Sequence, residues 1–309
     1  MKLALVIDLG GTNIKYGLST SKGELLYSDS VKTEAYLGKH AIVSKLLDII
    51  NLLIQKAVAD GNTVSGIGFG SPGIIDSVNK CLLGLGNNLK EWSNINFQTE
   101  IGDIIKLPIF VENDANLAAI GEYHFGDGMN DLDFVMITLG TGIGGGVIKQ
   151  NQIYRGSSFV AGEFGHMVVQ MKGRKCNCGR FGCWEAYASC SSFQKYYKRQ
   201  FNTFKSASQI LTLYYDKLLS YREVCFVDEF FEHVLIGLMN IVNAFDPHYL
   251  LIGGGLSEAH SKFVPDLNDR LRNMLPYVHK QFEIKKASLG NKAALLGGAA
   301  LVFSGENEC

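Results

Sequence analysis

No apolar run in this chain of 309 residues approaches the roughly 18 residues that a membrane-spanning helix requires. Basic residues are not concentrated anywhere either: 29 Lys and Arg are scattered along the chain, and the net charge is −1. Binding to nucleic acid or to an anionic membrane surface needs a basic patch. We therefore expect neither nucleic acid nor a membrane among the partners.

The apolar start of the chain is short and ends in Asp8 and glycines, so we expect it to form a strand and not a signal peptide. The seven cysteines are odd in number, and three of them cluster between residues 176 and 183. In the reducing cytoplasm that this leads us to expect, clustered thiols bind metal more often than they form disulfides. We expect a cytoplasmic protein whose clustered cysteines are metal ligands.

The sequence contains no GxxxxGK[ST] motif, which excludes a P-loop nucleotide site. A different glycine-rich turn follows the strand predicted over residues 3–8, and a second strand, not a helix, follows it, which disfavours a dinucleotide fingerprint. Its glycines let backbone N–H groups approach phosphate oxygens, and its aspartate could hold Mg²⁺. An ordinary hairpin is the alternative. The candidate residues are Asp8, Gly10, Gly11, Thr12 and Asn13.

A similar pattern returns after the strand predicted over residues 134–138. Five glycines fall within residues 140–146, and so many glycines disfavour any regular element, so we expect a loop around a ligand. Two phosphate loops, one from each half of the chain, fit a nucleoside triphosphate held across a cleft. The candidate contacts of the second loop are Gly140, Thr141 and Gly142.

This weak internal repeat and the length of the chain predict two similar α/β domains. We place the N-terminal domain at residues 1–117, joined by a C-terminal helix at about residues 292–309. The second domain then spans residues 118–291 and contains a zinc motif over residues 166–183. Residues 184–246 read mainly as helices, and residues 249–252 as a strand.

Asp114 follows a strand predicted over residues 107–111 and precedes a helix predicted over residues 115–124. Catalytic groups collect at such strand ends in α/β sheets. An aspartate there can accept the proton of a hydroxyl group as its oxygen attacks a γ-phosphorus. The alternative is a helix N-cap, which Asn113, Asp114 or Asn116 could supply.

The strongest motif is a C-x-C-G-x-x-G-C pattern with a histidine ten residues upstream. Three thiols and one imidazole complete a tetrahedral zinc site, and four protein ligands leave no open position for catalysis, so we expect structural Zn²⁺. Two carboxylates, Glu163 and Glu185, flank the motif. The predicted ligands are His166, Cys176, Cys178 and Cys183.

Together these segments resemble the ROK family of sugar kinases and repressors, which has the actin-like (ribonuclease-H-like) ATPase fold. The resemblance extends from the turn at residues 8–12 to Gly253-Gly254-Gly255. Its signature is the glycine run of residues 139–146, followed by spaced glycines and Gly165-His166, with the zinc motif in register.

The resemblance implies that Asp114 is the catalytic base and that the two glycine loops hold the phosphates of ATP, with Gly253, Gly254 and Gly255 near the adenosine. It implies that His166 uses one ring nitrogen for zinc and the other for the sugar. It also suggests a homodimer. The implied sugar contacts are Gly73, Asn88, Asn113, Asp114, Glu163, His166 and Glu185.

We therefore expect ATP- and Mg²⁺-dependent phosphorylation of a hexose at its 6-hydroxyl, with glucose as the first candidate. The alternatives are a kinase for N-acetylglucosamine, N-acetylmannosamine or fructose, since the chain has Gly86-Asn87-Asn88-Leu89 where glucokinase-like members often have a proline. A sugar-sensing regulator without catalysis is the alternative from another class. Family repressors carry an N-terminal helix-turn-helix, whereas here the first strand is predicted from residue 3, which favours an enzyme.

Overall fold

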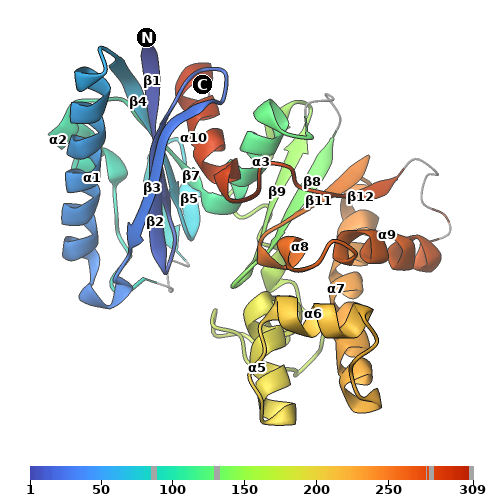
Figure 1. The fold of residues 1–309 in the computed structure, drawn as a ribbon. Helices are drawn as coiled ribbons and strands as arrows, with labels where there is room; N and C mark the ends of the chain where they lie inside the picture. The colour runs from blue at the N-terminus through green and yellow to red at the C-terminus, as the bar shows by residue number, and fades with distance from the viewer. Residues whose placement is uncertain (85–88, 129–132, 276, 278–281, 306–309) are drawn as a thin grey trace. The chain divides into compact units, whose positions relative to one another are not determined.

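The computed structural model describes residues 1–84, 89–128, 133–275, 277 and 282–305, which form two compact units (Figure 1). Unit 1 consists of Met1–Asn130, Arg155–Val160 and Asn291–Cys309, and unit 2 consists of Asp131–Tyr154 and Ala161–Gly290. The boundary expected at residue 117 would cut helix α3 (Asp114–Phe125). The whole of α3 belongs to unit 1, because it packs against α10 (Ala293–Ser304).

Unit 1 contains a five-stranded sheet in the order β3-β2-β1-β4-β7. Its strands are β1 (Lys2–Leu9), β2 (Asn13–Ser19), β3 (Leu25–Lys32), β4 (Thr63–Ser71) and β7 (Ile109–Asn113). Strands β1, β4 and β7 run parallel, whereas β2 and β3 return antiparallel beside β1. Asp8 pairs with Gly70, and Gly70 pairs with Glu112, so the three parallel strands end at one edge of the sheet.

Helices cover both faces of this sheet (Figure 1). Helix α1 (Lys39–Ala59) buries one apolar stripe against the face that carries Leu5 and Ile7. Helix α10 packs on the opposite face, which carries Ala4 and Val6. Successive residues of a strand point to opposite faces, so the uninterrupted apolar sequence of β1 supplies both layers of the core.

Glycines let α3, α10 and β4 approach each other closely. A Cβ atom added at Gly121 would overlap the carbonyl oxygen of Ala293, and one at Gly297 would overlap that of Leu117. A Cβ at Gly68 would overlap the backbone of Gly298. The last helix can therefore pack on the fold only with small residues at these positions.

We expect Gly297→Ala to lower the free energy of unfolding by about 1–3 kcal/mol, the cost of overpacking a close contact. Alanine favours a helix over glycine by about 1 kcal/mol, so a loss would run against intrinsic propensity. Urea unfolding measures the change. The control is Gly255→Ala, at a helical glycine where a Cβ meets no heavy atom within 4 Å. Equal stability of the two variants would contradict close packing at Gly297.

The segment between β4 and α3 contains elements that the sequence did not predict. They are β5 (Ile74–Asp76), β6 (Cys81–Gly84), a π-helical turn (Gln98–Gly102) and α2 (Asp103–Ile105). A 3-10 turn (Ala35–Leu37) precedes α1. The indole nitrogen of Trp92 donates to Ser71 Oγ at 3.1 Å and fixes this segment to the end of β4. Residues 86–88, with the predicted sugar contact Asn88, lie outside the described residues.

Unit 2 repeats the topology of unit 1, with the sheet order β10-β9-β8-β11-β12. Its strands are β8 (Phe134–Leu139), β9 (Ile143–Lys149), β10 (Gln152–Ile153), β11 (Tyr249–Gly253) and β12 (Glu283–Lys286). In both sheets the first strand is central, with an antiparallel pair on one side and two parallel strands on the other. The predicted α/β repeat is thus confirmed.

The helices of unit 2 come mostly from the region predicted as helical. They are α4 (Glu185–Ala188), α5 (Cys190–Phe201), α6 (Ala207–Tyr215), α7 (Tyr221–Phe245), α8 (Gly255–Ala259) and α9 (Phe263–Met274), with a 3-10 turn at Phe164–His166. Helix α7 contributes a long apolar face to the core. Across the part of the chain that the structure describes, no helix is both long and apolar enough to cross a membrane.

The first turn of α7 contains a carboxylate, Glu223, whose protonation should change the free energy of unfolding. Glu223 accepts hydrogen bonds from the Tyr197 hydroxyl and from Ser220, which lower the pKa of Glu223 to about 2 from an ordinary 4.5. A carboxyl whose pKa falls on folding stabilises the protein above its unfolded pKa. This contribution disappears as the pH falls through the folded pKa.

We therefore expect Glu223→Gln to lose on the order of 2 kcal/mol of unfolding free energy at pH 7. The difference from the wild type should shrink below pH 4.5 and vanish near pH 2. Urea unfolding across this pH range measures it, with the exposed Glu232→Gln as the control on the same helix. A difference that does not depend on pH would show that the charge of Glu223 is not responsible.

Candidate active site

The residues of the predicted phosphate loop of unit 1 form the turn that follows β1. The Gly10 N–H donates to the Asn13 carbonyl at 3.0 Å, and the Thr33 hydroxyl donates to the Gly10 carbonyl at 2.6 Å. The Asp8 carboxylate lies 3.6 Å from the Lys15 ammonium on β2. Burial raises the pKa of Asp8, and Lys15 opposes that shift. The turn thus presents one anionic side chain at the edge where the parallel strands end.

Asn113 caps α3, which decides among the three residues that the sequence left open. Its Oδ1 accepts from the N–H groups of Ala115 and Asn116 at 2.9 and 3.1 Å. Asp114 is the first residue of the helix, and its Oδ1 accepts from the Ala115 N–H at 2.9 Å. The helix therefore does not need Asp114 as its cap.

Gly73 and Asn113, both predicted sugar contacts, lie together in the structure. The Asn113 Nδ2 donates to the Gly73 carbonyl at 3.1 Å. Gly73 has a φ of 101°, a region that other residues rarely adopt. Asn113 uses one of its two amide hydrogens here, and the other has no partner among the residues that the structure describes.

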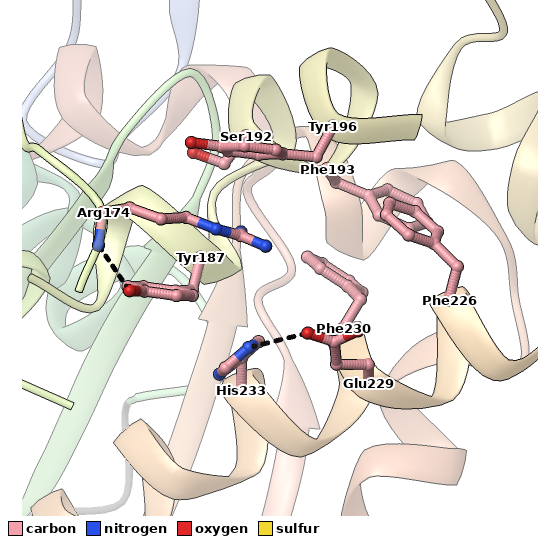
Figure 2. Close-up of a pocket in the computed structure, with 9 residues that line it drawn as sticks. All are labelled: Arg174, Tyr187, Ser192, Phe193, Tyr196, Phe226, Glu229, Phe230 and His233. Carbon is pink, nitrogen blue, oxygen red and sulfur yellow. Dashed lines mark hydrogen bonds and ion pairs between the residues drawn. The ribbon is translucent and has the colours of Figure 1, made fainter. Parts of the chain in front are cut away.

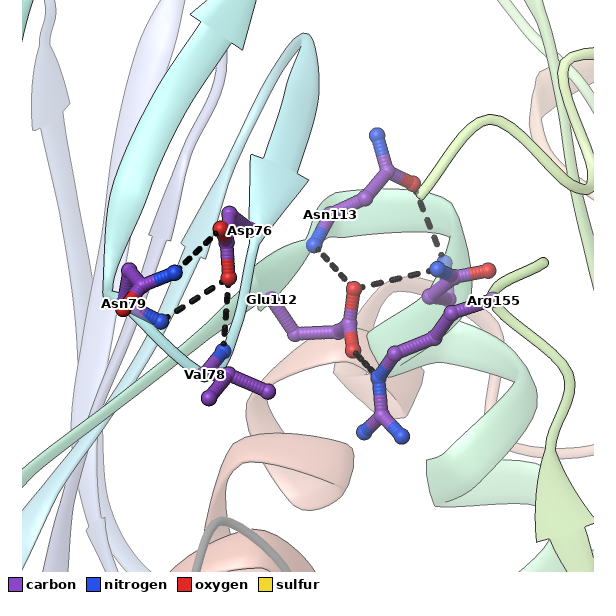
Figure 3. A network of polar contacts seen from close by, with 7 residues as sticks. Asp76, Val78, Asn79, Glu112, Asn113 and Arg155 are labelled. Atoms are coloured by element: carbon purple, nitrogen blue, oxygen red, sulfur yellow. Dashed lines mark hydrogen bonds and ion pairs between the residues drawn. The ribbon is translucent and has the colours of Figure 1, made fainter. Parts of the chain in front are cut away.

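Glu112 is a buried charge in this site that the sequence did not reveal. Its side chain is 1% exposed, and its Oε2 accepts from the Arg155 Nε at 2.6 Å (Figure 3). Its Oε1 accepts from the Asn113 N–H and from the Asn116 Nδ2. A glutamate within the apolar strand of residues 109–113 was the available signal, because such residues are rarely buried without a partner.

The four predicted zinc ligands converge in unit 2. Their ligand atoms all lie within 4.8 Å of one another. The Cys178 and Cys183 sulfurs are 3.6 Å apart, and the Cys176 sulfur is 3.8 Å from the His166 Nδ1. A tetrahedron with bonds of about 2.3 Å has edges of about 3.8 Å, so the distances fit a single ion.

Tight turns and one anchor hold this cluster in place. Gly179 and Gly182 have φ values of 90° and 82°, which give the backbone the turns it needs between the sulfurs. Trp184 is fully buried beside the cluster, and its indole nitrogen donates to the His233 carbonyl at 2.8 Å. A Cβ at Gly237 on α7 would overlap the Trp184 ring, so this glycine lets the metal segment sit directly on α7.

A small cavity lined by Arg174, Tyr187 and Tyr196 is part of the packing of unit 2 and not a ligand site. Figure 2 shows the Arg174 guanidinium between the rings of Tyr187 and Tyr196, 4.4 and 3.7 Å from their centroids. The His233 ring lies 4.6 Å from that of Tyr187. The cavity measures about 10 Å³, which is too small for a sugar. These contacts attach the metal segment to α5 and α7.

The two flanking carboxylates differ in their contacts. The Glu163 Oε2 lies 3.8 Å from the His166 Nε2, on the side of the ring away from the sulfurs, and burial raises the pKa of Glu163. The Glu185 Oε2 accepts from the Ile143 N–H at 2.9 Å, and its Oε1 is 4.0 Å from the Cys176 sulfur. Glu185 thus connects the metal cluster to the second glycine turn.

The second glycine turn is shorter than expected. Residues 140–142 form it, with the Gly140 N–H donating to the Gly142 carbonyl at 3.0 Å, but Ile143–Lys149 is strand β9. The prediction of a loop through residue 146 is therefore wrong. A Cβ at Gly145 would overlap the Phe164 ring, so packing within the protein explains this glycine.

The predicted adenosine residues lie beside this turn. Strands β8 and β11 are parallel, with Gly253 paired to Thr138, so the turns that follow them share one edge of the sheet. Gly254 has a φ of 82°, and a Cβ there would lie 2.7 Å from the backbone of Leu139. Unit 2 therefore gathers two glycine turns at one edge of its sheet, and Glu185 connects the first of them to the cluster of candidate metal ligands.

The family model described as ROK family matches residues 4–304. The chain belongs to the ROK family. It is 31% identical to a glucokinase of Halalkalibacterium halodurans, over 97% of this chain and 95% of that protein. The crystal structure of a ROK family glucokinase from Streptomyces griseus in complex with glucose and AMPPNP is 31% identical, with a TM-score of 0.82 over 98% of this chain and 99% of that one.

The relatives also include regulators. A xylose repressor of Bacillus spizizenii is 32% identical over 84% of this chain and 66% of the repressor. Family membership therefore establishes the fold. Because the relatives include both kinases and repressors, the side chains of the site must distinguish a kinase from a regulator.

Proposed function

We propose that this ROK protein is a kinase that transfers the γ-phosphoryl group of ATP to the 6-hydroxyl of glucose. The observation that carries this is the position of Asp114, which follows the cap Asn113 as the first residue of α3, directly after the end of β7 at the edge of the sheet. The full-length similarity to glucokinases supports the choice of sugar.

Each unit would contribute distinct groups. In unit 1, Asp114 would take the proton of the 6-hydroxyl as its oxygen attacks the γ-phosphorus, and the spare amide hydrogen of Asn113 would hold a neighbouring hydroxyl. In unit 2, Glu163, Glu185 and the His166 Nε2 would bind the remaining hydroxyls. Gly73 and Asn88 are the further sugar contacts that we propose from the family resemblance.

The glycine turns would hold ATP. Backbone N–H groups at residues 10–13 and 140–142 would face its phosphates, and Gly253–Gly255 would lie near the adenosine. Asp8 would hold Mg²⁺, which, when bound, neutralises charge on the phosphates. His166, Cys176, Cys178 and Cys183 would hold Zn²⁺, a closed site that shapes the sugar pocket and leaves no position for water activation.

The decisive experiment is a coupled assay of ADP release with glucose, mannose, fructose, N-acetylglucosamine and N-acetylmannosamine. We expect glucose to give the highest kcat/KM. Preference for an N-acetylated sugar or fructose would replace glucose while keeping the kinase mechanism. Tight sugar binding by calorimetry without any phosphorylated product would instead favour a regulator, as the repressor relatives suggest.

We also propose a homodimer, on the family resemblance. Light scattering coupled to gel filtration should give a mass near twice the 33.9 kDa of the chain. A mass of one chain at micromolar concentration would contradict this.

A further inference from the structure

Arg155 occupies an unusual place in the chain. It begins the segment Arg155–Val160, which belongs to unit 1 although the residues on both sides of it belong to unit 2. The same segment continues into the proposed sugar-binding Glu163 and His166 of unit 2. The Arg155 side chain is 22% exposed and reaches back to the Glu112 carboxylate, its ion-pair partner in unit 1 (Figure 3).

Glu112 links Arg155 to the turn that contains Asp114, the proposed base. One of its oxygens is taken by Arg155, at 2.6 Å from the Nε. The other accepts from the Asn113 N–H at 2.9 Å and from the Asn116 Nδ2 at 3.0 Å. These hydrogen bonds hold the residues on both sides of Asp114. Burying a carboxylate is costly unless a compensating charge lies beside it, and the Arg155 guanidinium supplies that charge.

The Arg155–Glu112 network contributes little to the stability of the fold, because some of its buried polar atoms are unsatisfied. The Arg155 Nη2 and the Asn116 Oδ1 are buried, and neither has a hydrogen-bond partner among the residues that the structure describes. Unpaired buried polar atoms lower stability, and apolar residues of similar size would avoid that cost. Because this ion pair carries a cost in stability, its presence indicates another role, which is to position the turn of Asn113 and Asp114.

We propose that Arg155 is a positioning residue: through Glu112 it fixes the turn of Asn113 and Asp114 in the geometry that phosphoryl transfer requires. This inference rests on the proposed kinase function. It predicts that the Arg155–Glu112 pair affects the chemical step more than ATP binding, because a displaced base lowers kcat without removing contacts to the nucleotide.

The test uses the full chain with three variants. We expect Arg155→Met to lower kcat about 10²-fold while the KM for ATP changes by less than roughly threefold. Arg155→Lys should recover part of kcat, because the ammonium restores the charge but not the planar Nε contact. The double variant Arg155→Met with Glu112→Gln removes the unpaired charge, so it should regain the thermal stability lost in Arg155→Met while kcat stays low.

A merely structural role predicts a different result: the double variant would recover kcat together with stability, and that would overturn the proposal. Arg270→Met in unit 2 is the matched control, since Arg270 also lies in an ion pair, with Asp266 at 2.8 Å. It should change stability and leave kcat within about twofold of the wild type. A kcat for Arg155→Met within the same range would also overturn the proposal.

Amide hydrogen exchange separates this inference from the proposed function. Without any ligand, Arg155→Met should increase exchange about tenfold in the peptide covering residues 109–120, and not in α1. If the wild type phosphorylates no hexose, the kinase function fails, and the exchange rates alone then decide the role of Arg155. Unchanged exchange in that peptide would refute the positioning role even in an active enzyme.

Discussion

Replacing Asp114 by asparagine is expected to lower kcat by about 10²- to 10⁴-fold, the usual contribution of a general base. The asparagine side chain can still accept the Ala115 N–H through its carbonyl oxygen, so the start of α3 should remain intact. It cannot accept the proton of the 6-hydroxyl. Sugar affinity, measured by calorimetry, should therefore stay within a few-fold of the wild type while turnover is lost.

The control for this substitution is Asp60→Asn, at the end of α1 and exposed to solvent. It removes the same charge from the same unit and should leave kcat unchanged. Full activity of Asp114→Asn would show that another group takes the proton and would require a different mechanism. Asn113→Ala is complementary: it removes the cap of α3, so it should lower both stability and kcat.

The strand ends and the cluster of candidate metal ligands were predictable because their signals are local. An apolar run followed by glycine and aspartate marks a buried strand and its turn, which located the ends of β1, β7 and β8 within a residue or two. The four candidate metal ligands were proposed from their types and spacing, and the structure brings all four side chains together.

Features that depend on distant contacts were not predictable. The glycine at residue 145 looked like part of a ligand loop, whereas the structure shows it making room for the Phe164 ring. Glu112 and Arg155 are 43 residues apart in sequence, and nothing in the residues between them indicates that they pair. The choice of Asn113 as helix cap depended on its backbone angles, since three neighbouring residues had suitable side chains.

Loss of the metal cluster is the second change from which we expect a large effect. Cys178→Ser should lower sugar affinity by about 10²-fold or more, because on our proposal a metal on the Nδ1 would fix the ring of His166 and so direct its Nε2 to the sugar. Most of the secondary structure should remain, because the cluster occupies one short segment beside an extensive core. Calorimetry and far-UV circular dichroism measure the two effects.

The matched control is Cys225→Ser, which removes an exposed thiol of α7 and should leave zinc content and sugar affinity unchanged. Zinc measured by atomic absorption should be near one ion per chain in the wild type and in this control, and near zero in Cys178→Ser. A zinc-free protein that binds sugar with wild-type affinity would show that the hydrogen-bonded segment around Trp184 orients His166 without the metal. The cluster would then stabilise the fold locally and have no part in recognising the sugar.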